Sequence, residues 1–245
     1  GSRTTDMVFD RAEVIQGKEE YDTLPGSYDD NGEVEQLVIY LKDRNYNLTL
    51  ELHYYVYEKC DIITRSAKLV NSGNESVRLE RLMSMQLDLN ESDYELSFFN
   101  GAWAREMNRS RIPIRAGKYV NESVTGTSSN RANPFFMIGR SSTTEDYGEC
   151  YGFNLIYSGN HYEAAQVNSY GKLRLVSGIN PATFSYIIEA GKCFEAPEAV
   201  LTYSYKGYNR MSHNMHEFVR KHIVRGSWRD KERPVLINSW EAAYF

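Results

Sequence analysis

Apolar and polar positions alternate through most of the chain between about residues 35 and 206. The clearest row is Leu48, Leu50, Leu52, Tyr54 and Val56, which alternates with more polar or mixed residues. A period of two places successive side chains on opposite faces of a strand. We therefore expect this row to pack one face of a β-sheet.

Similar rows recur along the chain, separated by turn residues such as those at 43–45 and 71–74. Further strands are predicted at residues 37–41, 63–69, 77–89, 135–139, 151–157, 173–176, 184–188 and 200–205, and another ends at residues 98–99. No helical period interrupts them, which predicts an all-β, antiparallel sandwich or barrel. Residues 105–133 are polar and rich in Arg, Asn and Ser, so we expect a long loop system there.

The pattern changes to a helical one at Met211. Ser212 is the expected N-cap and Gly226 the expected stop. Between them, Met215, Phe218, Val219, His222 and Ile223 share one face at a spacing of about 3.6 residues. This predicts an amphipathic helix of about four turns. The basic residues near its end fit stabilisation of the helix dipole better than a phosphate site.

The last thirteen residues follow a different pattern again. Residues 235–237 form a continuous apolar run, typical of a parallel strand covered on both faces. Polar residues and Trp240 follow it, at the end of the strand where ligand sites form in parallel α/β folds. A parallel strand needs neighbours, so we expect the chain to be the front part of a longer protein. Trp240 offers a flat apolar wall suited to a pyranose ring, with structural packing as the alternative.

Composition narrows the class of protein. The chain has 245 residues, 41% hydrophobic and 25% charged, as in ordinary soluble domains. A net charge of −5 argues against nucleic acid or an anionic membrane as partner. No apolar run approaches the roughly 20 residues of a membrane span. Cys60, Cys150 and Cys193 are far apart in the sequence, which favours reduced, buried thiols and a cytoplasmic location.

Motifs for chemistry are sparse. His213, His216 and His222 share the predicted helix, but no carboxylate or thiol set completes a metal site, so we expect a packing role for His222 and no metal or cofactor. No nucleophile elbow, Walker loop or dinucleotide fingerprint is present. Trp103 could stack on a sugar, although burial in the core or in a subunit interface is the favoured interpretation.

Many short segments match one known family, in the expected order and over essentially the whole chain. They are residues 24–26 (LPG), 61–66 (DIITRS), 79–83 (LERLM), 101–106 (GAWARE), 133–136 (NPFF), 143–146 (TTED), 151–153 (YGF), 157–159 (YSG), 178–181 (GINP) and 228–245. On these residues the chain resembles bacterial-type α-galactosidases of glycoside hydrolase family 36.

The resemblance implies a mainly β fold: a large antiparallel β-supersandwich of the galactose-mutarotase type, a linker helix and the start of a (β/α)₈ barrel. The expected domains are the sandwich at 3–207 without its first strands, the linker helix and connection at 208–232, and the first strand of a truncated catalytic barrel at 233–245. Full-length relatives release terminal α-linked galactose from raffinose- and melibiose-type oligosaccharides. They retain configuration through two carboxylates.

Both carboxylates belong to barrel motifs that this sequence lacks, so no catalytic residue is expected here, and the chain alone should be inactive. By position, Trp240 matches the tryptophan that lines the galactose subsite, and Tyr244 lies close to it. The chain has Ser239 where relatives usually have Asn. The resemblance also implies a homo-oligomer, a tetramer in full-length relatives. A non-catalytic carbohydrate-binding or assembly module stays open, as does a sibling specificity such as α-N-acetylgalactosaminidase.

Overall fold

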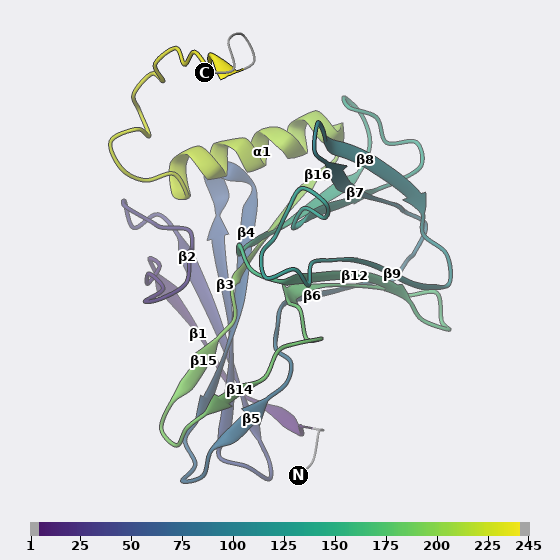
Figure 1. Cartoon of the computed structure of the whole chain (residues 1–245). Helices are drawn as coiled ribbons and strands as arrows, with labels where there is room; N and C mark the ends of the chain where they lie inside the picture. The colour runs from purple at the N-terminus through teal and green to yellow at the C-terminus, as the bar shows by residue number, and fades with distance from the viewer. Residues whose placement is uncertain (1–4, 241–245) are drawn as a thin grey trace.

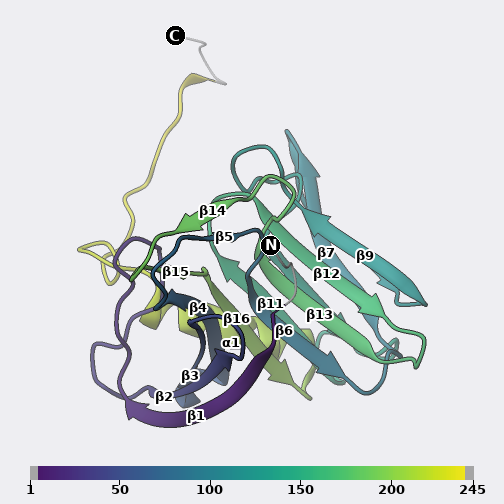
Figure 2. The same ribbon diagram turned by 90° about the horizontal axis from the view of Figure 1, so that it is seen from below.

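The computed structural model describes residues 5–240, and its strands form antiparallel sheets (Figures 1 and 2). The large sheet runs in the order β1 (Met7–Gln16), β2 (Glu35–Asp43), β3 (Leu48–Tyr57), β4 (Ile62–Asn71), β16 (Glu198–Ser204), β11 (Cys150–Ile156), β10 (Phe135–Gly139), β7 (Glu95–Ala102) and β8 (Arg105–Pro113), with β15 (Cys193–Glu195) also on β4. The small sheet runs β6 (Met83–Leu89), β13 (Leu173–Ile179), β12 (His161–Val167) and β9 (Gly117–Glu122). A third pair joins β14 (Tyr186–Ile188) to β5 (Val77–Leu79). The mainly β prediction is confirmed.

The helices complete the architecture. A short 3₁₀ helix, η1 (Glu58–Cys60), links β3 to β4, and α1 (Gly207–His222) follows β16. In Figure 1, α1 lies across the ends of the large-sheet strands, and the end of the chain extends away from the sandwich beyond it. Strand β16 lies at the centre of the large sheet, where it pairs with β4 on one side and β11 on the other.

Two cores lie on opposite faces of the large sheet. The small sheet packs Leu173 and Leu175 against Phe153 and Leu155 of β11 in the first core. On the other face, Phe218 of α1 joins the second core with residues of β3, β4 and β16. Burying such side chains contributes about 1.5–3 kcal/mol each.

The covered face of β3 changes along its length. Leu48 packs with Leu69 and Ile188 under β5 and β14, as the alternation predicts. Toward the end of the strand, Tyr55 and Tyr57 are buried beneath α1 instead, whereas Val56 is 39% exposed. The prediction that the whole Leu48–Val56 row packs is therefore wrong at its end, because different elements cover the two ends on different faces.

One part of the large sheet has little cover. Val14, Leu37 and Tyr54 form a cross-strand row on β1, β2 and β3. Val14 is 75% exposed and Phe9, on the same edge strand, 66% exposed. Exposed apolar sheet faces with a free edge favour association with further strands or with another chain.

The predicted loop at 105–133 is partly wrong, because it contains β8 and β9. Both are edge strands, β8 on β7 and β9 on β12. Most side chains of β8 are exposed, so its sequence carries no apolar alternation. Strands β1, β12 and β15 were not predicted, and residues 77–89 divide between β5 and β6 in different sheets.

Helix α1 begins at Gly207, four residues before the predicted change of pattern, and Ser212 lies in its interior. Backbone carbonyls replace a side-chain cap: the Tyr208 and Asn209 N–H groups donate to the Thr144 and Glu145 oxygens at 3.1 and 2.8 Å. A distant loop thus satisfies the first turn, which no local N-cap pattern reveals.

Glycine on β11 lets α1 approach the sheet closely. A Cβ added at Gly152 would lie 2.5 Å from Met211 Sδ.

Of the cysteines, Cys60 and Cys150 are buried as expected, but Cys193 is exposed on β15, which corrects that prediction. All three are free thiols.

Candidate functional site

The candidate site at the end of the chain is open. Val235, Leu236 and Ile237 are 95%, 89% and 85% exposed and form no strand among the described residues. Trp240 is 61% exposed, and its backbone N–H donates to Asn238 Oδ1 at 3.0 Å. Tyr244 lies outside the described residues. The assignment of both residues to substrate binding stays a prediction.

The residues that lead from α1 to this tail contact an irregular segment, residues 17–34, between β1 and β2. Its first anchor is a carboxylate with no exposed surface, Glu198 of β16. Glu198 accepts hydrogen bonds from the Ser27 N–H and Ser27 Oγ, both at 2.7 Å, and from Thr64 Oγ1. The Lys18 ammonium lies 3.5 Å from the carboxylate. A buried charge needs such partners, since desolvation without them costs several kcal/mol.

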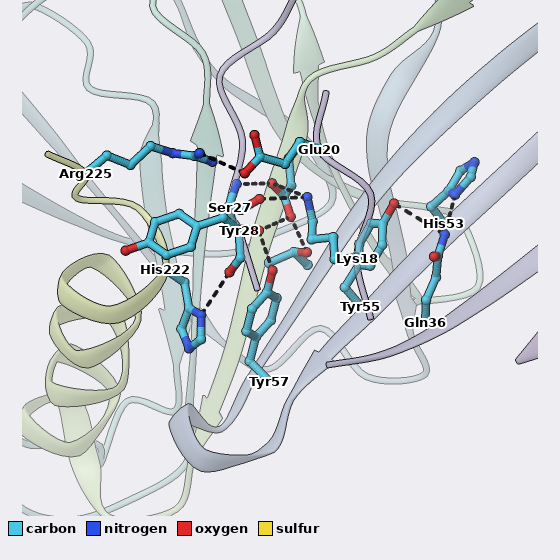
Figure 3. Close-up of polar contacts among 12 residues, drawn as sticks. Lys18, Glu20, Ser27, Tyr28, Gln36, His53, Tyr55, Tyr57, His222 and Arg225 are labelled. Atoms are coloured by element: carbon cyan, nitrogen blue, oxygen red, sulfur yellow. Dashed lines mark hydrogen bonds and ion pairs between the residues drawn. The ribbon is translucent and has the colours of Figure 1, made fainter. Parts of the chain in front are cut away.

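Aromatic rings lie beside the Lys18 ammonium, and Figure 3 shows Tyr55 among them. Lys18 Nζ lies 4.5 Å from the centroid of the Tyr21 ring and 4.6 Å from that of Tyr55, and it donates to the Ser27 carbonyl at 3.0 Å. Burial lowers the pKa of Lys18, which the nearby Glu198 charge opposes. A Cβ at Gly26 would lie 2.3 Å from the Tyr21 ring, so only glycine lets the segment pack this closely. The arrangement is closed and structural, with no opening for a substrate.

The second anchor joins Tyr28 to the end of α1. The Tyr28 N–H donates to the His222 carbonyl at 2.9 Å, and the Tyr28 carbonyl lies 3.0 Å from His222 Nδ1 (Figure 3). A carbonyl only accepts, so Nδ1 carries the proton in this bond. The His222 ring also packs 4.7 Å from the Tyr57 ring. The expected packing role of His222 is confirmed.

The hydroxyl of Tyr28 reaches further along the connection. It donates to the Val224 carbonyl at 2.8 Å and accepts from Arg229 Nη1 at 3.0 Å. The Arg225 guanidinium lies over the Tyr28 ring, 4.5 Å from its centroid, and pairs with Glu20 at 2.9 Å. Arg225 and Arg229, which follow α1, therefore bind residues 20–30.

Sequence reasoning did not identify Lys18, Tyr28 or Glu198. Ser27 and Glu198 are separated by 171 positions, so no local pattern connects them. The one available signal was the 24–26 string, which served only to carry the family resemblance.

Trp103 is 92% exposed at the turn between β7 and β8, so burial in the core of this chain is wrong. Stacking on a sugar and contact with another subunit stay predictions.

Among residues 5–240, no three His, Cys, Asp or Glu side chains group as a metal site. None of the helices described is long and apolar enough to cross a membrane.

Comparison with known proteins identifies the family to which this fold belongs. Residues 1–189 match the model of the glycosyl hydrolase family 36 N-terminal domain, and residues 193–245 match the melibiase model. The second match begins inside the sandwich, since β15 and β16 pair with β4 of the large sheet. The two matches define the chain as part of a glycoside hydrolase. It belongs to glycoside hydrolase family 36.

Similar proteins match over the whole chain. Alpha-galactosidase AgaA of Geobacillus stearothermophilus is 40% identical over 246 residues, and alpha-galactosidase C of Emericella nidulans is 36% identical over 245. The crystal structure of the α-galactosidase from Lactobacillus brevis superposes with a TM-score of 0.97 at 40% identity. The chain covers 100% of its own length but 34%, 33% and 33% of these three proteins. It therefore spans about a third of its relatives.

Proposed function

We propose that this chain is the amino-terminal part of an α-galactosidase that hydrolyses terminal α-D-galactosyl residues of raffinose- and melibiose-type oligosaccharides. The observation that carries the proposal is the match of the entire chain to α-galactosidases at 40% identity, in sequence and in fold. Variants of one relative, AgaA of Geobacillus stearothermophilus, were crystallised with stachyose and with raffinose, which supports an oligosaccharide as substrate.

The proposed mechanism retains configuration: one carboxylate attacks the anomeric carbon and a second protonates the leaving oxygen, then activates water. We assign both carboxylates to a part of the protein beyond residues 1–245. Within this chain, residues 233–245 are proposed to form the first barrel strand after the sandwich (3–207) and the linker (208–232). The exposed apolar run at 235–237 supports this, because neighbouring strands would bury it.

The activity proposal is tested with the protein encoded by the complete gene and an α-galactoside that carries a chromogenic leaving group. We expect turnover by the complete protein and no turnover above buffer by residues 1–245 alone. An α-N-acetylgalactosaminide measured in parallel tests the sibling specificity. Turnover by residues 1–245 alone would contradict the placement of the carboxylates.

Trp240 is proposed to line the galactose subsite, with Tyr244 beside it. Replacing Trp240 with Ala in the complete enzyme removes a stacking wall, so we expect kcat/KM to fall about 10- to 100-fold, or about 1.4–2.8 kcal/mol. Steady-state kinetics measure the change. Tyr170→Ala, at a residue 86% exposed in a turn, is the matched control. An unchanged kcat/KM in Trp240→Ala would remove this residue from the subsite.

We also propose that the complete protein acts in the cytoplasm as a homo-oligomer, a tetramer. Three free thiols support a reducing compartment. Exposed apolar side chains on β1 and at Trp103 support contacts with further chain, from the same polypeptide or from another subunit.

A further inference from the structure

Contacts with one residue, Tyr28, fix the path of the chain after α1. Tyr28 contacts the connection at four positions: His222 through its backbone, Val224 and Arg229 through its hydroxyl, and Arg225 through its ring. Tyr28 itself is 3% exposed, whereas the side chains of its partners Arg225 and Arg229 are 49% and 38% exposed. A residue that holds both the end of a helix and the next turn of chain fixes the direction in which the chain continues.

Tyr28 is itself held from the interior. The preceding residue, Ser27, is 1% exposed and binds Glu198 through both its N–H and its hydroxyl. Glu198 belongs to β16, the central strand of the large sheet. The position of Tyr28 is therefore determined by the sheet, through Ser27 and Glu198.

Among the described residues that follow Arg229, residues 230–233 make local contacts. Arg233 donates to the Trp228 and Lys231 carbonyls, and Asn238 binds the Trp240 N–H, within the part of the chain described. Arg229 binds Tyr28 and lies 3.4 Å from Asp30. Before the apolar run at 235–237, it is thus the last described residue that ties the connection to the sandwich.

We propose that Tyr28, through its hydroxyl bonds to Val224 and Arg229, is a positioning residue that aligns the Trp240 strand with the substrate subsite. The inference rests on the proposed function of Trp240, and it adds a role for the 17–34 segment. Since a wall residue contacts substrate in both the ground state and the transition state, misplacing it raises KM more than it lowers kcat.

The test uses the complete enzyme and Tyr28→Phe, which keeps the ring and the backbone bonds and removes only the hydroxyl. We expect KM for a chromogenic α-galactoside to rise about three- to tenfold, with kcat changed less than twofold. Arg229→Ala should give a similar rise, Arg229→Lys should restore part of it, and the Tyr28→Phe/Arg229→Ala pair should not be additive. Tyr170→Phe, at an exposed tyrosine, is the control. A KM within 1.5-fold of wild type, or additive effects, overturns the proposal.

A second readout separates this inference from the proposed function. Trypsin cleavage after Arg229 and Lys231 reports on how firmly the connection is held, whether or not the enzyme turns over a galactoside. We expect faster cleavage there in Tyr28→Phe than in wild type or Tyr170→Phe. If the wild-type enzyme is inactive toward α-galactosides, the proposed function fails. An unchanged cleavage rate in Tyr28→Phe overturns the positioning role by itself.

Discussion

Replacing Glu198 with Ala is expected to destabilise the protein by about 3–5 kcal/mol, because it leaves a buried charge without its partner. The substitution removes the acceptor for Ser27 and Thr64 and the counter-charge of Lys18, whose side chain is fully buried. It also frees residues 17–34 from β16. Urea or thermal unfolding of the variant measures the loss.

Two comparisons make the Glu198 result specific. Glu217→Ala removes an exposed pair with Lys221 on α1 and should cost about 0.5 kcal/mol or less. Adding Lys18→Met to Glu198→Ala removes the unpaired ammonium and should recover part of the stability. A loss below about 1 kcal/mol in Glu198→Ala would show that the ion pair is not a principal anchor.

Glu163→Gln is expected to stabilise the protein at pH 8 and to have little effect near pH 4.5. Glu163 lies on β12 and is 2% exposed; Asn121 Nδ2 donates to its Oε2 at 2.8 Å, and Oε1 has no partner among the described residues. Burial raises the pKa of Glu163 to about 8, an effect that the Asn121 hydrogen bond partly opposes.

The direction of the pH effect follows from proton binding. Between its ordinary pKa near 4.5 and about 8, the Glu163 carboxyl is protonated in the folded state and ionised in the unfolded state. The unfolded state binds fewer protons in this window, so the stability of wild type falls as pH rises through it. Glutamine keeps the neutral form at every pH, and we expect a gain of about 2–4 kcal/mol at pH 8.

Unfolding measured at several pH values checks this expectation, with the exposed residue Glu75 replaced by Gln as control. His161, on the same strand, adds the opposite trend on the acid side. Burial lowers the pKa of His161 to about 4, so stability falls as pH drops from 6.5 toward 4. This second effect is common to wild type and Glu163→Gln. A gain that does not grow between pH 5 and 8 would show that Glu163 is ionised in the folded protein.

Local patterns predicted most interior strands, although not β12, and predicted the edge strands poorly. Strand β3 carries a clear alternation, yet the pattern could not show that its buried face changes where α1 replaces β5 and β14 as cover. Edge strands such as β8 bury too little to leave an alternating signal. The start of α1 depends on carbonyls of residues 144–145, which are brought there by the fold.

The candidate site was accessible only through resemblance. A tryptophan after an apolar run suggests a ligand wall, but the galactose assignment of Trp240 came from family motifs. The contacts that hold its approach, Ser27 with Glu198 and Tyr28 with Arg229, join positions 171 and 201 residues apart. Such pairs leave no trace in any short window of sequence.

The central place of β16 has a practical consequence for dissecting this protein. Adjacent residues of this strand serve three environments: Glu198 the ion pair, Ala199 the core beneath the small sheet, and Val200 the core beneath α1. A polypeptide that ends at residue 189, where the first family match stops, would lack β16. The edges of β4 and β11 that pair with β16 would then both be unpaired. The region matched by the family model and the region that packs as one sandwich therefore have different ends, and the second extends through α1.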